Sequence, residues 1–116
     1  MDNYESEKTI SLWDDGSRKC VTLKNIQTGK VFTFVVKHSF IVGRVSKYCD
    51  LQITASDRYM SGRHIRFINE EGGLCIEDLH TKNGTKLNGK PVLSKVRIRQ
   101  GDILKMGRSE FVVTFG

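Results

Sequence analysis

Apolar and polar residues alternate along most of the chain after position 19, which is the period of a β-strand with one buried face. Residues 20–26 place Val21 and Leu23 on one side, and residues 31–37 do the same with Phe34 and its apolar neighbours. The triplet QTG between the two segments has the composition of a tight turn. This pattern predicts a β-hairpin.

Further stretches of the same kind are short, rich in β-branched and aromatic residues, and separated by Gly, Asn, Asp or Ser. We predict strands at residues 40–43, 51–53, 64–68, 73–79, 84–88, 95–98, 102–107 and 110–116. No segment sustains the 3.6-residue period of an α-helix, although residues 54–60 have room for one helical turn. Regularly spaced short strands are typical of a β-sandwich or barrel, so the predicted fold class is all-β.

Asn-Gly occurs twice within a few residues, at Asn83-Gly84 and at Asn88-Gly89. An Asn-Gly pair flanked by strand-forming residues favours a two-residue hairpin turn, because both positions tolerate positive φ. Only three residues separate the pairs, too few for both to be simple hairpin turns around an ordinary strand. We predict that Asn88-Gly89 is the hairpin turn, with Pro91 opening the return strand, and that Asn83-Gly84 ends a longer loop.

The formal net charge is +6, and the charges are unevenly distributed. Residues 1–15 contain five acids and one base, whereas residues 16–116 contain 18 bases and 8 acids. Because residues 1–19 also lack sustained alternation, we predict an acidic flexible tail at 1–19 and one folded domain at 20–116. A basic domain attracts anions, which include nucleic acids, acidic membrane surfaces and phosphorylated proteins.

The composition disfavours several classes of protein. The longest apolar run, around residues 31–36, is far shorter than the ~20 residues that cross a bilayer, and acids occupy the N-terminus where a signal peptide carries bases. We therefore expect no membrane association and a cytoplasmic, intracellular location. Three cysteines without a Cys-x-x-Cys pair and three scattered histidines predict no metal site, no disulfide framework and no cofactor. Cys75 is predicted to be a small buried hydrophobe.

Three predicted loops combine a cation, a hydroxyl or amide group and a glycine. They are Gly43-Arg44 with the following VSKYCD, Ser61-Gly62-Arg63-His64, and Thr81-Lys82-Asn83-Gly84-Thr85. A phosphorylated side chain brings a charge of about −1.5 to −2 and three acceptor oxygens, so its receptor needs fixed cations, hydroxyls and free N–H groups. None of the loops has the glycine-rich pattern that cradles a nucleotide ahead of a helix. The predicted ligand is therefore a phosphorylated side chain.

In their order and spacing these motifs, together with Asn88-Gly89, resemble the forkhead-associated (FHA) domain, a phosphothreonine-recognition module. The motif residues span 43–89, and the strand pattern extends the likeness over roughly residues 20–116. The resemblance implies an all-β, FHA-like (SMAD/FHA) sandwich of about eleven strands, whose loops at one end hold a phosphothreonine peptide. It further implies a protein–protein interaction module of kinase signalling and no enzymatic activity.

The resemblance also implies a role for each motif residue. Arg44 contacts the phosphate or holds the peptide backbone, Ser61 donates its hydroxyl to a phosphate oxygen, and Asn83 bonds to the peptide main chain. Gly62 departs from the family, in which many members have an asparagine that also grips the peptide backbone. The other implied phosphopeptide-binding residues are Arg63, Lys82 and Thr81. The implied architectural residues are Gly43, His64, Gly84, Asn88 and Gly89.

Two further functions fit a basic all-β domain: phosphorylation-independent docking of a protein, and nucleic-acid binding. The second requires exposed aromatic side chains as stacking platforms, whereas the predicted core faces hold Phe32, Phe34, Phe67, Phe111 and Phe115. His64 lies close to Ser61 in the sequence, as the base and nucleophile of a catalytic pair can. However, no acid that could orient the histidine lies at a recognisable spacing. The expected partner is therefore a phosphothreonine-containing protein or peptide, with a Ser/Thr kinase upstream.

The acidic tail contains Thr9 within ESEKTISLW. FHA domains commonly select partners by the residue three positions after the phosphothreonine, and here that residue is Leu12. We hypothesise that a phosphorylated Thr9 occupies the chain's own binding site or that of a neighbour; the alternative is a disordered linker with Trp13 packed on the sandwich edge. Because a lone recognition module usually serves something attached to it, we also expect the chain to be a fragment of a longer protein.

Overall fold

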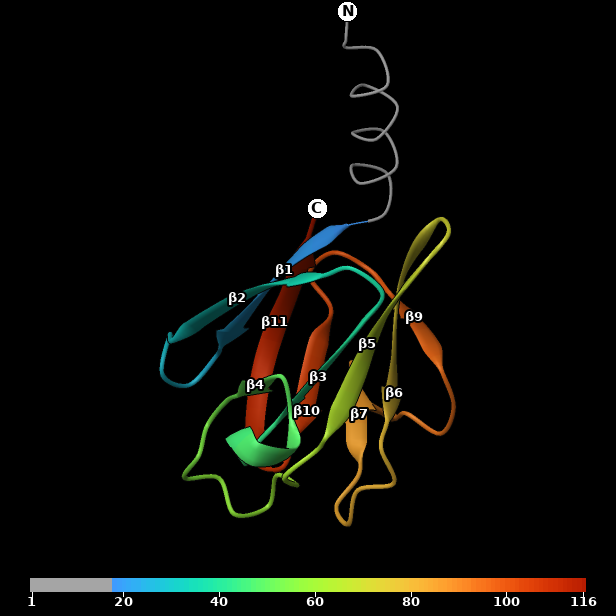
Figure 1. Cartoon of the computed structure of the whole chain (residues 1–116). Helices are drawn as coiled ribbons and strands as arrows, with labels where there is room; N and C mark the ends of the chain where they lie inside the picture. Colours follow the sequence, from blue (N-terminus) through green and yellow to red (C-terminus); the bar gives the residue numbers. More distant parts are fainter. Residues whose placement is uncertain (1–17) are drawn as a thin grey trace, which may run out of the picture.

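The computed structural model describes residues 18–116, which form a sandwich of two β-sheets (Figure 1). The described elements are β1 (Lys19–Asn25), β2 (Val31–Val36), β3 (Ser39–Gly43), the 3₁₀ turn η1 (Ser46–Tyr48), β4 (Leu51–Gln52), β5 (Ile65–Glu70), β6 (Gly73–Asp78), β7 (Thr85–Leu87), β8 (Lys90–Pro91), β9 (Val96–Ile98), β10 (Ile103–Met106) and β11 (Ser109–Phe115). The predicted all-β class and the number of strands are confirmed. No helix in this part of the chain is long and apolar enough to cross a membrane.

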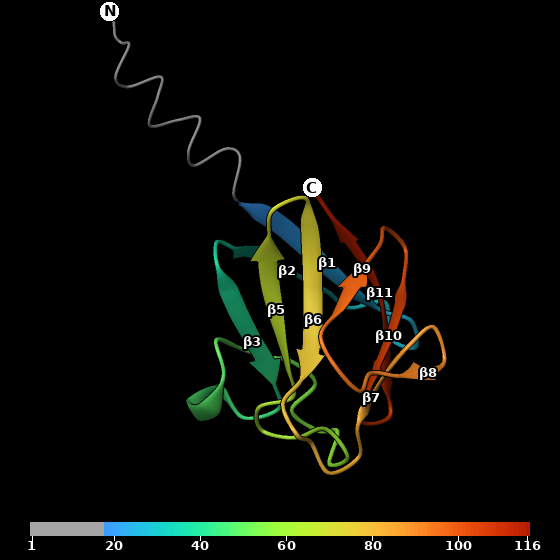
Figure 2. The ribbon, with the colours of Figure 1, turned by 90° about the vertical axis from the view of Figure 1, so that its right-hand side faces the viewer.

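One sheet has the strand order β2-β1-β11-β10-β7-β8, and the other has the order β4-β3-β5-β6-β9. Figure 2 shows β3, β5 and β6 of the second sheet in front of β1 and β11 of the first. The predicted hairpin of β1 and β2 is present, with Thr22 opposite Thr33. All pairings are antiparallel except that of β4 with β3, which is parallel.

The core lies between the sheets and is built from the inward residues of the alternating segments. Leu23, Phe67 and Phe111 are fully buried there, and Phe34 packs edge-on against Phe67 with ring centroids 5.3 Å apart. Cys75 is 4% exposed, as its alternating surroundings predict. The predicted core face of the phenylalanines is confirmed, with Phe32 and Phe115 partly buried against the cluster.

Strand β8 is the return strand predicted to begin at Pro91 after the Asn88-Gly89 turn; it is too short to have a pattern of its own, and β7 supplies its hydrogen-bonding partner. The structure differs from the predicted elements at residues 54–60. Residues 54–60 contain no helix; they form two successive turns, in which the N–H of Asp57 donates to the C=O of Thr54 and the N–H of Met60 to the C=O of Asp57. The single helical turn, η1, instead lies in the loop after β3.

Asn88-Gly89 is the turn of the β7–β8 hairpin. Its φ angles of +52° and +85° are those of a type I′ turn. The side chain of Asn88 also reaches β10: Nδ2 donates to Asp102 Oδ1 at 3.0 Å, and Oδ1 accepts the N–H of Ile103 at 2.9 Å. The hairpin is therefore fixed to the neighbouring strand by a side chain as well as by backbone pairing.

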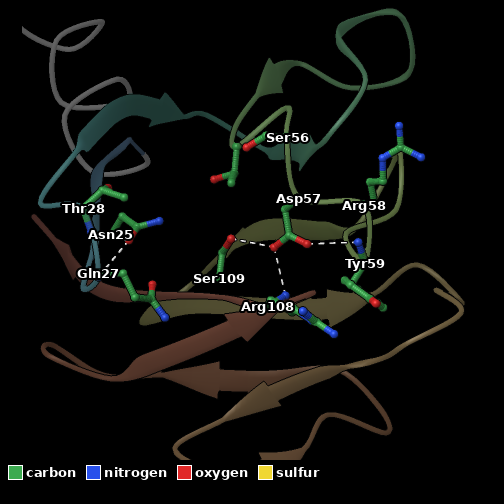
Figure 3. Close-up of a pocket in the computed structure, with 10 residues that line it drawn as sticks. Asn25, Gln27, Thr28, Ser56, Asp57, Arg58, Tyr59, Arg108 and Ser109 are labelled. Carbon is green, nitrogen blue, oxygen red and sulfur yellow. Dashed lines mark hydrogen bonds between the residues drawn. The ribbon is translucent and has the colours of Figure 1, made fainter.

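The buried carboxylate of Asp57 fixes the long loop before β5 to the β10–β11 turn (Figure 3). It accepts the Ser109 hydroxyl at 2.6 Å and the backbone N–H groups of Arg108 and Tyr59 at 2.9 and 3.0 Å. Burial raises the pKa of Asp57, but these hydrogen bonds outweigh it and hold the pKa below its usual value. A Cβ on Gly107 would lie 2.8 Å from both carboxylate oxygens, so only glycine allows this approach.

The two termini of the described chain lie together at one end of the sandwich. The N–H of Cys20 donates to the C=O of Gly116 at 2.8 Å. Strand β1 starts at Lys19, within the range predicted as tail, and Thr9 lies outside the described residues. The loops that follow β3, precede β5 and follow β6 lie at the opposite end (Figure 1).

Candidate functional site

Three loops meet at the end of the sandwich opposite the termini: residues 44–50, 53–64 and 79–84. The first two are joined by backbone hydrogen bonds, since the N–H of Arg44 donates to the C=O of Ser61 at 3.0 Å and that of Val45 to Gly62 at 3.4 Å. The sequence-predicted motifs, which lie far apart in the chain, are thus brought to one surface.

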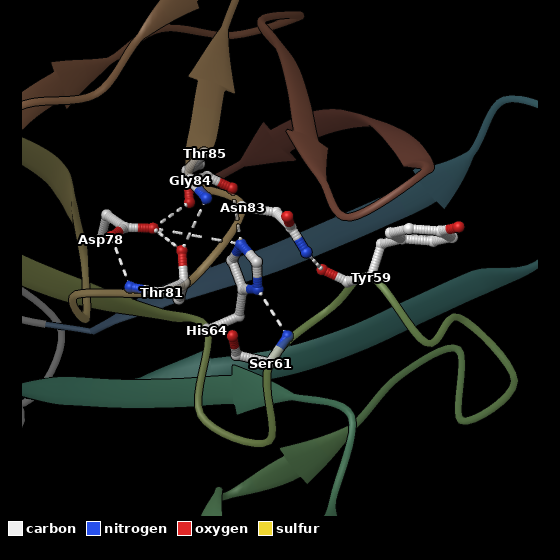
Figure 4. Close-up of polar contacts among 8 residues, drawn as sticks. All are labelled: Tyr59, Ser61, His64, Asp78, Thr81, Asn83, Gly84 and Thr85. Atoms are coloured by element: carbon white, nitrogen blue, oxygen red, sulfur yellow. Dashed lines mark hydrogen bonds and ion pairs between the residues drawn. The ribbon is translucent and has the colours of Figure 1, made fainter.

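His64 links the second loop to the third from beneath (Figure 4). It is fully buried, its Nδ1 accepts the N–H of Ser61 at 2.9 Å, and its Nε2 lies 2.9 Å from the C=O of Gly84. Nδ1 must be unprotonated to accept, so Nε2 carries the proton and donates to Gly84. Burial lowers the pKa of His64, and this outweighs the Gly84 hydrogen bond and the charge of Asp78, which raise it.

We predict that the domain loses stability as the pH falls below about 6.5, the ordinary pKa of histidine. In this range the unfolded chain takes up a proton at position 64, whereas the folded domain keeps His64 neutral. The free energy of unfolding therefore has its full value above this pH. At lower pH it decreases, by at most about 1.4 kcal/mol per pH unit. The lowered pKa values of Asp57, Asp78 and Glu70 reduce stability in a more acidic range, as the pH falls through the ordinary carboxyl values of 3.8 and 4.5.

Denaturant unfolding at several pH values from about 5 to 7.5 measures this slope. The variant with His38→Gln and His80→Asn leaves His64 as the only histidine, and Asn suits the φ of +57° at position 80. Titration of the His64 ring by NMR gives the folded-state value directly. A ring that titrates at or above the pKa of a free imidazole would contradict the prediction.

Asp78 organises the third loop at the end of β6. Its Oδ1 accepts the hydroxyls of Thr81 and Thr85, both at 2.6 Å, and its Oδ2 accepts the N–H of Thr81 at 2.9 Å. The Thr81 hydroxyl in turn accepts the N–H of Gly84 at 3.0 Å. The resemblance implies a peptide contact for Thr81, whereas the structure shows its hydroxyl engaged inside the loop.

Arg44 and Ser61 present polar groups at the surface of the joined loops. Arg44 Nε donates to the C=O of Met60 at 2.9 Å, which fixes the plane of the guanidinium. Within residues 18–116, the two terminal nitrogens of Arg44 and the hydroxyl of Ser61 have no hydrogen-bonding partner. Asn83 is joined to the loop that carries Ser61, because its Nδ2 donates to the C=O of Tyr59 at 3.0 Å.

Two glycines set how closely the first two loops approach. A Cβ on Gly43 would lie 2.1 Å from the carbonyl oxygen of Gly62, so any side chain there collides with backbone. A Cβ on Gly62 would lie 3.1 Å from Cδ2 of Tyr48. The Tyr48 ring therefore borders the space into which a residue-62 asparagine, common in the FHA family, would project.

The end of the sandwich that carries these loops is rich in cations. Arg63 and Lys82 are exposed there, and in the described part of the chain neither they nor Arg44 form an ion pair. In this part no three His, Cys, Asp or Glu side chains could hold a metal ion. The arrangement suits an anion with several acceptor oxygens.

Sequence reasoning missed three residues that shape this region. Asp57 and Asp78 hold two of the loops, and Tyr59 lies half exposed with the Arg108 guanidinium 4.0 Å from its ring centroid. In the sequence, an Asp shortly before a turn or at a strand end is only a weak sign that its side chain joins distant segments. Such residues commonly hydrogen-bond within their own turn and to nothing else. Their partners are far away in the sequence, so only the folded chain shows them.

Comparison with known proteins places this geometry in a family. The model of the FHA domain family matches residues 40–107. An FHA domain-containing protein of Arabidopsis thaliana is 28% identical over 93 residues, which are 78% of this chain and 24% of that protein. The FHA domain-containing protein FhaA of Mycobacterium tuberculosis is 29% identical over 100 residues, which are 86% of this chain and 16% of that protein.

A solved FHA domain, from a structural and functional study of phosphothreonine-dependent FHA domain interactions, superposes with a TM-score of 0.69. It is 26% identical, and the match covers 82% of this chain and 95% of that one. The chain thus spans less than a quarter of each curated relative but nearly all of the solved domain. The resemblance inferred from the motifs is confirmed, and this chain belongs to the FHA domain family.

Proposed function

We propose that the chain is a recognition module that binds phosphothreonine in a partner protein at the three joined loops. The observation that carries the proposal is the arrangement of Arg44 and Ser61. The guanidinium is held in place through Nε, while its terminal nitrogens and the neighbouring hydroxyl remain open to a ligand. Donors that are fixed before binding cost little entropy when a phosphate arrives. The phosphothreonine-dependent interactions studied for a solved relative support the same function.

Isothermal titration with matched phosphothreonine, phosphoserine and unmodified peptides tests the proposal, starting from the tightest binders of a degenerate phosphothreonine library. A small charge-assisted site is expected to give a Kd near micromolar, about −8 kcal/mol. Phosphoserine lacks one methyl group, worth about 1 kcal/mol when buried, so it should bind about fivefold more weakly. Equal binding of the unmodified peptide would point to phosphorylation-independent docking. Selective binding of single-stranded nucleic acid would instead favour a nucleic-acid-binding domain.

The two Asn-Gly pairs lead to contrasting predictions. Asn83→Ala removes an exposed amide with one hydrogen bond to Tyr59, so we expect a loss of stability below about 1 kcal/mol and a loss of peptide affinity of at least about tenfold. Asn88→Ala removes two hydrogen bonds to the start of β10 and places alanine at a φ of +52°. We expect it to cost about 2 kcal/mol of stability and to leave peptide affinity unchanged.

Denaturant unfolding and peptide titration of both variants, side by side, check this contrast. Each variant serves as the matched control of the other, since the same amide is removed at two Asn-Gly pairs. The reverse assignment, in which Asn88→Ala loses the peptide and Asn83→Ala unfolds more easily, would refute the roles proposed for the two loops.

The proposal includes no catalytic step by this chain. Asp78 Oδ1 lies 4.0 Å from His64 Nε2, so an acid does stand beside the histidine. However, Nδ1 accepts the backbone N–H of Ser61 and not its hydroxyl, and both ring nitrogens are engaged below the surface. A nucleophile needs a base within hydrogen-bonding reach of its hydroxyl, and this geometry does not provide one.

The partner in this proposal is a protein phosphorylated by an upstream Ser/Thr kinase in the cytoplasm. The chain's own tail is one such candidate through Thr9. Ten residues from Thr9 to Lys19 reach at most about 33 Å, and β1, which begins at Lys19, starts at the end of the sandwich opposite the loops (Figure 1). We therefore infer that a phosphorylated Thr9 is bound by a second copy more readily than by its own domain.

Light scattering of the Thr9-phosphorylated chain tests this inference. The expected result is dimerisation that depends on concentration and is reversed by an excess of phosphothreonine peptide. A chain that stays monomeric yet loses affinity for the added peptide would show binding to its own site instead. A monomer with unchanged peptide affinity would leave the tail as a linker.

A further inference from the structure

A groove beside the candidate phosphopeptide site, on the loop of residues 53–64, is lined by cations that form no ion pair within the described residues. A pocket of about 460 Å³ lies between the turn of residues 25–28, the loop of residues 54–59 and the Arg108–Ser109 pair (Figure 3). A second hollow of about 600 Å³ shares Asn25, Thr28, Thr54 and Ser56 with it and extends to Lys30. The two hollows adjoin at these four shared residues, and we call them together the depression; its walls come from three segments that are distant in the sequence.

Three cations line this depression: Arg58, Arg108 and Lys30. Arg108 lies over the Tyr59 ring at 4.0 Å, and Lys30 over the Phe32 ring at 5.2 Å. In the described residues none of the three forms an ion pair. The aromatic rings therefore hold Arg108 and Lys30 in place without neutralising their charge.

Among the described residues, Asp57 is the only acid that lines the depression, and its carboxylate already accepts the Ser109 hydroxyl and two backbone N–H groups. The hydroxyls of Thr54 and Ser56 have no partner in the described part of the chain and add donors. Thr54 also has a φ of +49°, an unusual conformation for a β-branched residue and one that tends to occur at functional sites. The chemistry of the depression is therefore that of an anion site.

The depression continues the candidate phosphopeptide site. Tyr59, which lines it, accepts the Asn83 side chain through its C=O and precedes Ser61 by two residues. A peptide held at Ser61 and Asn83 that continues past Tyr59 in an extended conformation enters the depression within a few residues, at about 3.3 Å per residue.

We propose that this depression is a second anion subsite, which binds a phosphate or carboxylate side chain of the same partner segment that carries the phosphothreonine. This inference rests on the proposed function and deepens it, because it assigns a preference for doubly anionic partners. The motif residues proposed for the first site do not line this depression. Selectivity arises because a partner with one phosphate leaves Arg58, Arg108 and Lys30 without a counter-charge.

The test uses the tightest-binding phosphothreonine peptide with alanine flanks. Glutamate or a second phosphothreonine is placed singly at each position from two to six residues before and after the first phosphothreonine. Titration at fixed ionic strength is expected to show a gain at one or two adjacent positions on one side only. Relative to alanine, glutamate should bind about threefold more tightly and phosphate about tenfold. These two arms identify which source of charge the subsite prefers.

The double variant Arg58→Gln/Arg108→Gln is expected to abolish the gain. Its matched control, Lys24→Gln/Lys105→Gln, also removes two positive charges, from exposed positions on β1 and β10. Both variants should bind the all-alanine peptide alike, while only the control keeps the gain. A gain that is equal at all positions, or equal in the two variants, would reduce the effect to general charge attraction and overturn the subsite.

The two proposals fail in different ways. If the all-alanine phosphothreonine peptide binds but no anion at any position improves it, the proposed function stands and the second subsite is wrong. If no phosphothreonine peptide binds the native chain, both proposals fall.

Discussion

Arg44→Ala is expected to weaken phosphothreonine-peptide binding about 10- to 150-fold, the range that corresponds to the 1.5–3 kcal/mol of hydrogen bonds to a charged group. The guanidinium is oriented by the bond from Nε to the C=O of Met60, so a ligand does not have to order it. Loss of that bond should cost about 1 kcal/mol of stability, and the domain should remain folded. Peptide titration and denaturant unfolding measure the two effects.

Two further variants make this result specific. Arg44→Lys keeps the charge but loses the planar fork and the anchor on Met60, so most of the affinity should still be lost. Arg99→Ala removes an exposed arginine whose side chain forms no hydrogen bond or ion pair in the described residues, and it should bind like the native chain. Native affinity in Arg44→Ala would show that the phosphate is bound elsewhere.

Gly43→Ala is expected to destabilise the domain by at least about 3 kcal/mol, at the upper end of the cost of overpacking. The added Cβ would lie 2.1 Å from the carbonyl oxygen of Gly62 and 2.7 Å from its carbon. Backbone cannot rotate away as a side chain can, so the strand β3 and the loop before β5 must separate. Separation also breaks the bond between Arg44 N–H and Ser61 C=O, so the variant should lose the peptide as well.

Gly84→Ala is the matched control for this substitution. Gly84 has a φ of +77° but open space around its Cβ position, so alanine there meets strain without collision. We expect a cost of about 1–2 kcal/mol. Denaturant unfolding of the two variants measures the stability lost to a backbone collision at position 43 and to a strained φ at position 84. Equal losses of stability at the two positions would contradict the role given to Gly43.

Local patterns predicted much of this fold because they act over a few residues. Alternation in β1 and β2 fixed which residues face the core, since a strand with one buried face must alternate. Asn88-Gly89 predicted its own turn, because the residue pair tolerates the positive φ angles that a type I′ turn requires. Strand β8 was predictable only as the return strand of this turn, because two residues carry no period of their own.

The candidate site was predicted only as a set of residues. The spacing of Arg44, Ser61 and Asn83 in their motifs identified them together, through resemblance to a family. That resemblance could not show that the Thr81 hydroxyl is engaged with Asp78, or that the Tyr48 ring borders the space beside Gly62. Each of these depends on a neighbour whose position is set by the surrounding loops.

The sequence by itself determined the all-β class, the faces of the strands, the hairpin turn at Asn88-Gly89 and the family. These follow from local periodicity, turn chemistry and motif order. Only the tertiary structure decided that His64 joins Ser61 to Gly84, that Asp57 holds its loop to the β10–β11 turn, and that a cationic groove adjoins the site. The reason is physical: these contacts join residues up to 52 positions apart, and they exist only when the two sheets have packed and brought their loops to one end.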